Sequence, residues 1–193
     1  MKQVYLIRHG QTLFNKQKKI QGFCDSPLTD LGIKQAEIAR QHIEELGMSF
    51  DEAYSSTSER AIDTLKIITD IDFKTDKNLR EWNFGELEGE GEHLNPSLPY
   101  GDFFVQFGGE DEKEFQKRIS HTIFNIVKNS KAENILIVSH GAAIAQFYLT
   151  WEKYSDVKRM GRIQNCSIFK YTFQDDIFKL NEIIEHDFSS IEK

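Results

Sequence analysis

The segment Val4-Tyr5-Leu6-Ile7-Arg8-His9-Gly10 decides the fold class, because its pattern returns far along the chain as Ile135-Leu136-Ile137-Val138-Ser139-His140-Gly141. Each segment is a short apolar run that leads into a polar residue, a histidine and a glycine. Near-continuous Val, Ile and Leu over this length predicts strands at 4–7 and 134–138 in a parallel sheet covered on both faces. Ligands of such sheets bind beyond the carboxyl ends of the strands. If the two strands are neighbours, His9 and His140 face one pocket.

Helix and strand signals alternate along the rest of the chain. Thr29 is a suitable N-cap for a helix over 29–46 that ends before Gly47, and Ser56-Thr57-Ser58-Glu59 has capping-box spacing. The remaining elements are predicted as helices at 56–69, 110–129 and 141–151, a strand at 51–55, and a hairpin of strands 167–173 and 178–184 with its turn at Gln174-Asp175-Asp176. This order predicts an α/β fold: a three-layer sandwich with a mostly parallel central sheet and helices on both faces, in a single domain over 1–193.

Residues 85–109 do not fit this alternation, because they are rich in glycine and aromatic residues and contain Pro96 and Pro99. We expect a short excursion over the carboxyl edge of the sheet, since its apolar residues Phe103, Phe104, Val105 and Phe107 need burial. Two interpretations stay open for the aromatic residues of this region. They either line a substrate-selective lid or pack in the core; the residues concerned are Trp82, Tyr100, Phe103, Phe104 and Phe107.

The composition limits the possible partners. With 39% hydrophobic and 28% charged residues and a formal net charge of −7, the chain has the composition of a globular protein without general attraction to nucleic acid or anionic lipid. Cys24 and Cys166 are far apart, which is typical of reduced thiols. The early charge at Arg8 argues against a signal-peptide core, and no apolar run approaches the ~20 residues needed to span a bilayer. We therefore expect a cytoplasmic protein that binds neither nucleic acid nor membranes.

The paired histidines suggest nucleophilic catalysis on phosphorus, in which a neutral imidazole forms a phosphohistidine that water later hydrolyses. Guanidinium groups stabilise phosphoryl oxygens with paired donors. Arg8 adjoins His9, and Arg60 falls in the first turn of a predicted helix, where the positive end of the helix dipole also favours an anion. A carboxyl group with a raised pKa could protonate the leaving oxygen and later deprotonate water. Glu81, beside bulky aromatic residues that could desolvate it, is the best candidate.

Other ionisable residues have less specific interpretations. Four carboxylates follow Glu81 so closely that composition alone does not choose among them, and most are predicted to be solvated: Glu86, Glu88, Glu90 and Glu92. The remaining histidines are predicted to be structural or solvated: His42, His93, His121 and His186. Of these, His93 is in the excursion, which could reach over the pocket.

Five motifs in order resemble the histidine phosphatase superfamily, also called the phosphoglycerate mutase-like family. Arg8-His9-Gly10-Gln11-Thr12, with Asn15, resembles its N-terminal signature, and Gln21-Gly22 and Pro27-Leu28-Thr29-Asp30-Leu31-Gly32 resemble the segment that follows. Ser55-Ser56 through Arg60-Ala61 and Thr64 is similar to its second-arginine motif. Leu79, Glu81, Gly85, Glu88 and Gly89 fit its acid/base segment, and Val138-Ser139-His140-Gly141 fits its second histidine. The match runs from residue 4 to about residue 150.

The resemblance implies a role for each matching residue. His9 is the expected phosphorylated nucleophile, and Glu81 is the expected general acid and then base. Arg8, Arg60 and His140 are expected to hold the phosphoryl oxygens, with Asn15 and Gln21-Gly22 as further contacts. Family members of this kind need no metal or other cofactor. The sequence offers no clear carboxylate cluster for magnesium, although the spacing of Asp25 and Asp30 leaves that open.

The sequence departs from the family pattern in a few places. Lys19-Ile20 precedes Gln21 where many relatives have an arginine, and Leu87 stands where a tryptophan is common. The chain is also short for the phosphoglycerate mutases it resembles, and a more open pocket admits water. The shortness favours a metal-independent histidine acid-type phosphatase that hydrolyses phosphomonoesters of a small phosphorylated metabolite. A phosphoglycerate mutase-type phosphotransferase and a non-catalytic phosphate-binding module are the alternatives.

Overall fold

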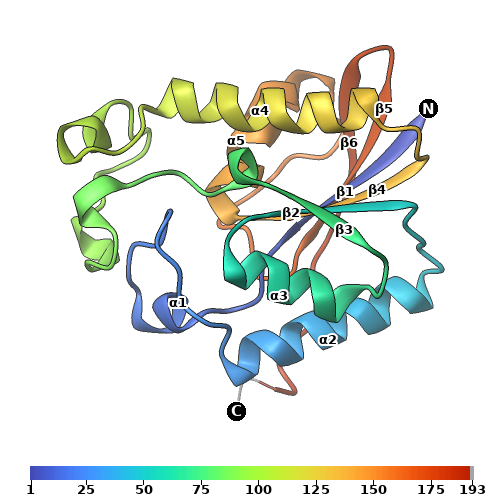
Figure 1. Cartoon of the computed structure of the whole chain (residues 1–193), viewed down its shortest axis with the longest axis horizontal. Coiled ribbons are helices and arrows are strands. Elements are labelled where there is room, and N and C mark those ends of the chain that lie inside the picture. The colour runs from blue at the N-terminus through green and yellow to red at the C-terminus, as the bar shows by residue number, and fades with distance from the viewer. Residues whose placement is uncertain (192–193) are drawn as a thin grey trace.

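The computed structural model describes residues 1–191 and is built on a central six-stranded sheet in the order β3-β2-β4-β1-β5-β6 (Figure 1). The last two residues of the range predicted as one domain lie outside the described residues. The strands are β1 Lys2–Arg8, β2 Glu52–Ser56, β3 Phe73–Asp76, β4 Asn134–Ser139, β5 Ile168–Gln174 and β6 Ile177–Ile184. The first four are parallel to one another, whereas β5 and β6 form an antiparallel hairpin against β1. The sheet is therefore mostly parallel, as the sequence predicted.

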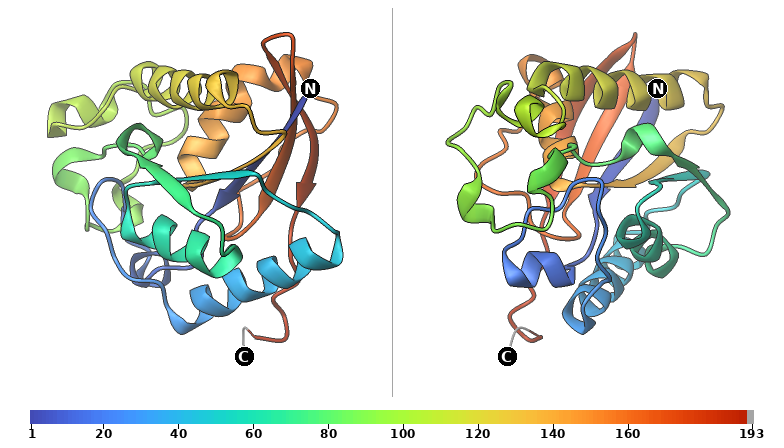
Figure 2. Two further views of the ribbon diagram at one scale, coloured as in Figure 1. Left: turned by 45° about the vertical axis from the view of Figure 1, so that its right-hand side comes forward. Right: turned by 60° about the vertical axis from the view of Figure 1, so that its left-hand side comes forward.

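Helices cover both faces of the sheet, which confirms the predicted three-layer sandwich. α2 (Asp30–Glu45) and α3 (Glu59–Ile68) lie on one face, and α4 (Glu112–Asn129) and α5 (Gly141–Trp151) lie on the other (Figures 1 and 2). Side chains of a strand alternate between faces, so Val4 and Leu6 of β1 join the core beneath α4 and α5, while Tyr5 and Ile7 join the core beneath α2 and α3. No helix in residues 1–191 is long and apolar enough to cross a membrane.

The two strands with matching sequence pattern are direct neighbours. β1 pairs in parallel with β4, and the register sets Arg8 opposite Ser139. Because β1 and β4 are parallel and end side by side, the residues that follow them lie at the same edge of the sheet. The loop after β1 also packs closely on the start of α2, because a Cβ on Gly10 would lie 2.4 Å from the carbonyl oxygen of Gly32. Only glycine at position 10 permits this approach.

Local structure differs from the prediction in several places. The short helix α1 (Leu13–Gln17) and the strand β3 were not predicted. The predicted capping box at residues 56–59 is wrong: Ser56 is the last residue of β2, and the N-cap of α3 is Ser58, which makes no side-chain cap hydrogen bond. Instead the Ser58 amide donates to Oγ of Ser56. The Ser56 hydroxyl therefore lies at the end of β2 and does not cap α3.

The excursion at 85–109 consists largely of short 3₁₀ helices, η2 (Gly85–Leu87), η3 (Glu92–Leu94) and η4 (Phe103–Phe107). It lies beside the segment that carries α1 in the views of Figures 1 and 2, and Lys19 bridges to Gly91. Phe104 is completely buried and contacts the rings of Trp82 and Tyr100. The expectation that Val105 is buried is wrong, because this side chain is 49% exposed on the outer side of the short η4 helix.

Candidate active site

His9 and His140 lie together at the carboxyl edge of the sheet, as the sequence predicted. Their ring centroids are 5.3 Å apart. The His9 amide donates to the carbonyl oxygen of Ser139 at 3.1 Å, which continues the ladder between β1 and β4 by one residue. Both side chains are buried, at 4% and 0% exposure respectively. Strand pairing, and not proximity in sequence, therefore creates this site.

The surroundings of His9 determine which ring nitrogen is free. Nδ1 lies 2.8 Å from the carbonyl oxygen of Gly10, which can only accept, so Nδ1 carries the hydrogen and Nε2 keeps its lone pair. Burial lowers the pKa of His9 well below 6.5, and the positive charges of Arg60 and Arg8 lower it further. His9 is thus neutral near pH 7, with an unprotonated nitrogen available as a nucleophile.

His140 precedes α5 and is also neutral. Its pKa is lowered well below 6.5, first by burial and then by the positive charge of Arg60, and His9, Arg8 and Arg118 lower it further. Nε2 lies 2.7 Å from Oγ of Ser56, at the end of β2. Within residues 1–191, Nδ1 has no hydrogen-bond partner. Ser56 therefore orients the His140 ring, although the sequence predicted a helix-capping role for Ser56.

Glu81 is held by backbone amides at the start of α5. Its carboxylate accepts hydrogen bonds from the amides of Ala142 and Ala143, both at 2.9 Å, and from the amide of Trp82 at 3.1 Å. Burial raises the pKa of Glu81 above 4.5, although the amides of Ala142 and Trp82 and the positive charges of Arg60 and Arg8 oppose this rise. Desolvation is the largest effect. The raised pKa makes Glu81 suitable to exchange a proton.

The two arginines are buried and partly committed to backbone oxygens. Arg8 donates from Nη1 to the carbonyl oxygen of Ile163 at 2.6 Å, and burial lowers the pKa of this guanidinium to about 10. Arg60 donates to the carbonyl oxygens of Gly22 and Cys24 and forms an ion pair of 2.8 Å with Asp25. In the described part of the chain, Nε of each arginine lacks an acceptor. Such buried donors are those an anion would satisfy.

The segment between Asn15 and Gly22 folds against these residues. Gln21 accepts from the Thr12 hydroxyl and donates to Ser26, so its amide is fixed by one residue before the segment and one after it. Oδ1 of Asn15 accepts from the Thr12 amide at 3.2 Å. A Cβ on Gly22 would lie 2.2 Å from the carbonyl oxygen of Trp82, so no larger residue fits here without movement of the backbone.

A cavity of about 780 Å³ opens beside His9. Arg8, His9, Asn15, Gln21 and Glu81 line its inner part, whereas Gly22, Arg60 and His140 are packed behind the lining residues. The outer wall combines residues of the excursion, of α5 and of the loop before β5, namely Phe84, Glu92, Asn95, Leu98, Pro99, Tyr100, Ala145, Leu149, Arg159 and Arg162. Lys19 also lines the cavity, and it belongs to the Lys19-Ile20 pair before Gln21 where the family pattern often has an arginine.

Comparison with known proteins identifies the family. The family model described as the histidine phosphatase superfamily (branch 1) matches residues 4–185. The chain belongs to this superfamily. A probable phosphoglycerate mutase, GpmB, of Yersinia pestis (strain Pestoides F) is 33% identical over 188 residues, covering 91% of this chain and 86% of that protein.

Solved structures of superfamily members have the same fold. The crystal structure of phosphoglycerate mutase from Bacillus anthracis str. Sterne has a TM-score of 0.82 at 27% identity and covers 93% of this chain and 91% of that one. Phosphoserine phosphatase from Entamoeba histolytica, solved with 3-phosphoglyceric acid, has a TM-score of 0.75 at 29% identity and covers 96% and 98%. Phosphatases and mutases thus share this architecture.

The structure gives definite contacts to two acidic residues whose roles the sequence left open. Glu88, grouped with mostly solvated carboxylates, accepts from the amides of Phe23 and Phe84 and holds the loop that supports Arg60. Asp25, left open as a magnesium ligand, is the ion-pair partner of Arg60. Residues 1–191 contain no group of three or more His, Cys, Asp or Glu side chains arranged to hold a metal ion. Both residues contact segments that are distant in the sequence, so local spacing carries no signal for these contacts.

The other histidines lie outside the cavity. His93 and His121 are exposed on the surface. His42 and His186 contact each other through Nδ1 atoms 3.1 Å apart, and His186 is additionally bonded to the carbonyl oxygen of Cys166. These positions agree with the prediction that the four histidines are structural or solvated.

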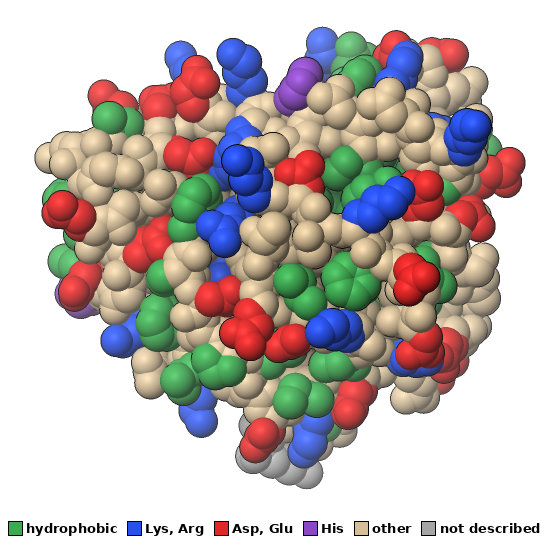
Figure 3. Space-filling model, in the orientation of Figure 1, with side chains coloured by type: hydrophobic (Ala, Val, Ile, Leu, Met, Phe, Trp, Pro, Cys, Tyr) green, Lys and Arg blue, Asp and Glu red, His purple; other side chains and the backbone are tan. Residues whose placement is uncertain are grey.

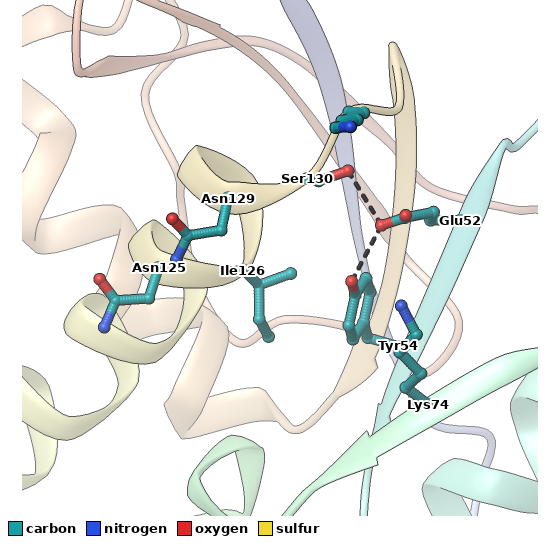
Figure 4. Close-up of a pocket in the computed structure, with 8 residues that line it drawn as sticks. Glu52, Tyr54, Lys74, Asn125, Ile126, Asn129 and Ser130 are labelled. Carbon is teal, nitrogen blue, oxygen red and sulfur yellow. Dashed lines mark hydrogen bonds between the residues drawn. The ribbon is translucent and has the colours of Figure 1, made fainter.

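A second hollow lies away from His9 and His140 (Figure 4). Its volume is about 550 Å³, and residues of β2, β3 and the end of α4 line it. The Glu52 carboxylate accepts hydrogen bonds from Tyr54 and Ser130, both at 2.9 Å, as the dashed lines show. These bonds lower the pKa of Glu52, so its charge is satisfied within the protein. On the face seen in Figure 3, acidic and basic side chains are interspersed.

Proposed function

We propose that the protein hydrolyses the phosphomonoester of a small phosphorylated metabolite through a phosphohistidine intermediate on His9. One observation carries this proposal: Nδ1 of the buried His9 is bonded to Gly10, which leaves Nε2 with a lone pair beside the cavity that Glu81 also lines. A nucleophile and a proton donor of suitable protonation state therefore share one space.

In the first step, the lone pair of His9 Nε2 forms a bond to phosphorus while the ester P–O bond breaks. The leaving oxygen takes the proton of the Glu81 carboxyl group, so an alcohol departs and Glu81 becomes a carboxylate. The raised pKa of Glu81 supports this role, since it keeps a proton on the group for transfer.

In the second step, water attacks phosphorus and the N–P bond breaks. The Glu81 carboxylate takes a proton from that water, which restores the carboxyl group, and the electron pair of the N–P bond returns to His9 Nε2. Inorganic phosphate leaves, and both residues are again in their starting states. The three backbone amides that contact Glu81 support this alternation, because they stabilise the carboxylate formed between the steps.

The charge on the phosphoryl oxygens requires positive partners during both steps. Arg8, Arg60 and His140 supply them in this proposal, with Asn15 and the Gln21-Gly22 segment as further contacts. The unpartnered buried atoms Nε of Arg8, Nε of Arg60 and Nδ1 of His140 support the assignment, since each can donate a hydrogen bond. With this set of donors, we propose that hydrolysis needs no metal or other cofactor.

Hydrolysis rather than mutase chemistry is favoured by the outer end of the cavity. Leu98 and Leu149 line it and yet are 75% and 44% exposed, so solvent adjoins the cavity wall. A mutase must protect its phosphohistidine from water until the phosphoryl group is returned. The names of GpmB and of the Bacillus anthracis structure favour the second candidate, a phosphoglycerate mutase-type phosphotransferase.

One experiment tests the proposal. The purified chain is incubated without metal with a panel of phosphorylated metabolites that includes 3-phosphoglycerate, and both free phosphate and isomer formation are measured. Phosphate release, together with acid-labile phosphate trapped on wild-type protein but not on His9→Ala, is the expected result. Isomer formation without free phosphate would establish the mutase. Phosphate or vanadate binding without turnover of any panel member would establish a non-catalytic binding module.

A further inference from the structure

Arg118, on the inner side of α4, contacts the backbone that carries Glu81. Its Nη1 donates to the carbonyl oxygens of Asn78 and Arg80 at 2.8 and 3.0 Å, and its Nη2 donates to the carbonyl oxygen of Glu81 at 3.0 Å. One guanidinium group therefore fixes three carbonyl groups of the segment 78–81. This segment begins in the short η1 helix (Lys77–Leu79) and has no regular structure after it.

Glu110 completes this arrangement. Arg118 donates from Nε and Nη2 to the two carboxylate oxygens of Glu110, each at 2.7 Å, in the parallel geometry that guanidinium and carboxylate groups favour. Glu110 also accepts from the Asn83 amide, and its carbonyl oxygen accepts from the indole nitrogen of Trp82. The residues on both sides of Glu81 are thus attached to the same ion pair.

The opposite side of Glu81 is fixed by α5, through the amides of Ala142 and Ala143. The Glu81 backbone is bonded to α4 and its carboxylate to α5, so the position of the acid depends on both helices. Arg118 itself does not line the cavity. With side-chain exposures of 17% for Arg118 and 21% for Glu110, the pair is partly shielded from water and from salt.

We propose that Arg118, paired with Glu110, is a positioning residue that holds the Glu81 carboxyl group where it can exchange a proton with the leaving oxygen and with water. This inference rests on the proposed phosphohistidine mechanism. It requires the forked shape of the guanidinium group and not its charge alone, because an ammonium group has three donors and no planar fork. Arg118→Lys keeps the positive charge but removes the planar fork, so it distinguishes the effect of shape from the effect of charge.

The test compares two substrates that differ in their need for an acid. The first-step rate is measured in rapid mixing with p-nitrophenyl phosphate, whose leaving group departs without a proton, and with an alkyl phosphate, whose leaving group requires one. Arg118→Met, Arg118→Lys and Glu110→Gln are compared with wild type. Arg40→Met is the matched control, since Arg40 forms ion pairs with Glu44 and Asp70 on the outside of α2.

Loss of a positioned acid is expected to slow the first step with the alkyl ester by about 10- to 100-fold in all three variants, part of the ~10²–10⁴-fold that a general acid contributes. The burst of nitrophenolate is expected to keep its wild-type rate constant within about threefold, since that step makes little use of an acid. Equal loss with both esters, retained activity in Arg118→Lys, or the same loss in Arg40→Met would overturn the proposal.

A second readout does not depend on turnover. Amide hydrogen exchange is measured at Trp82, Ala142 and Ala143, whose N–H groups donate to the Glu81 carboxylate. Faster exchange at these three amides in Arg118→Lys, with unchanged exchange in Arg40→Met, is the expected result, and unchanged exchange in Arg118→Lys contradicts the inference. If wild type hydrolyses neither ester, the proposed function fails, while the exchange data still report whether Arg118 holds Glu81.

Discussion

The rings of His9 and His140 lie 5.3 Å apart with an interplanar angle of 62°, and both are neutral. Burial is the main cause of their lowered pKa values, and the arginines beside them add to it. Protonation of either ring would place another positive charge in a desolvated site that already contains two guanidinium groups. The positive charge of the site is therefore carried by the arginines, and both imidazoles are uncharged.

Removal of the nucleophile should eliminate turnover. His9→Ala is expected to lower kcat for phosphomonoesters by roughly 10³-fold or more, because it removes the imidazole on which the proposed covalent intermediate forms. Steady-state kinetics and acid-quench trapping of labelled phosphate measure this. His93→Ala replaces an exposed histidine outside the cavity and should match wild type. Wild-type hydrolysis by His9→Ala would refute the mechanism.

The pH profile should depend on Glu81. Its raised pKa means that the acid form persists above pH 4.5 and is lost as pH rises through the shifted pKa, so kcat/KM for an alkyl phosphate should decrease on that side. Glu81→Gln should remove this alkaline limb and lower the rate by ~10²–10⁴-fold. Profiles of kcat/KM for both proteins check the assignment. An alkaline limb that survives in Glu81→Gln points to another acid.

The buried histidines should make the fold less stable in acid. In the unfolded chain each imidazole takes up a proton near pH 6.5, whereas His9 and His140 stay neutral to much lower pH in the folded protein. The two histidines therefore cause no loss of stability above pH 6.5. As pH falls below 6.5, protonation favours the unfolded chain, and the free energy of unfolding decreases by up to about 1.4 kcal/mol per pH unit for each histidine. Urea denaturation across this range measures the slope. His140→Gln should have a shallower slope than His93→Gln.

Phe104 should behave as a core residue. Phe104→Ala is expected to lower the free energy of unfolding by about 3–5 kcal/mol, because the side chain is completely buried among other rings. Phe107→Ala, in the same short helix but only half-buried, should cost less. Denaturant titrations compare the two. Equal, small losses would favour a loosely attached lid over a packed wall.

Activity should survive removal of divalent cations. Arg8 and Arg60 already provide positive charge at the proposed phosphoryl site, so prior dialysis against EDTA is expected to leave kcat within about twofold of the untreated value. Phosphate release before and after dialysis measures this. Restoration of a lost activity by added magnesium would mean that a metal takes part.

The sequence predicted the central features of the fold because they depend on local patterns. Two apolar runs that each end in a histidine and a glycine identified β1, β4 and the edge where the site lies. The N-cap Thr29 and the amphipathic spacing that follows predicted α2 closely. The short strand β3 was missed, since four residues with one apolar side chain, Phe73, carry too weak a periodic signal.

Local sequence patterns did not predict the contacts between segments that are distant in the sequence. The sequence predicted Ser56 as a helix cap because serine suits that position. In the structure its hydroxyl instead contacts His140, which directly follows the neighbouring strand β4. Arg118 falls in the helix predicted at 110–129 and received no role from the sequence, and its carbonyl partners lie 37 to 40 residues earlier in the chain. Polar side chains that bind backbone atoms elsewhere have no fixed spacing, so only the folded chain identifies them.

The position of β1 in the middle of the sheet has a consequence for biosynthesis. β1 pairs on one side with β4, with Gln3 opposite Asn134, and on the other with β5, with Gln3 opposite Thr172. The strand that leads into His9 is therefore synthesised long before β4 and β5 and has no sheet partner until β4 has left the ribosome. Closing such long loops is slow, and the apolar strand stays exposed meanwhile. Chaperone dependence should thus be greatest for nascent chains that have not yet reached β4, and recovery of activity on refolding should coincide with the last pairing at the centre of the sheet.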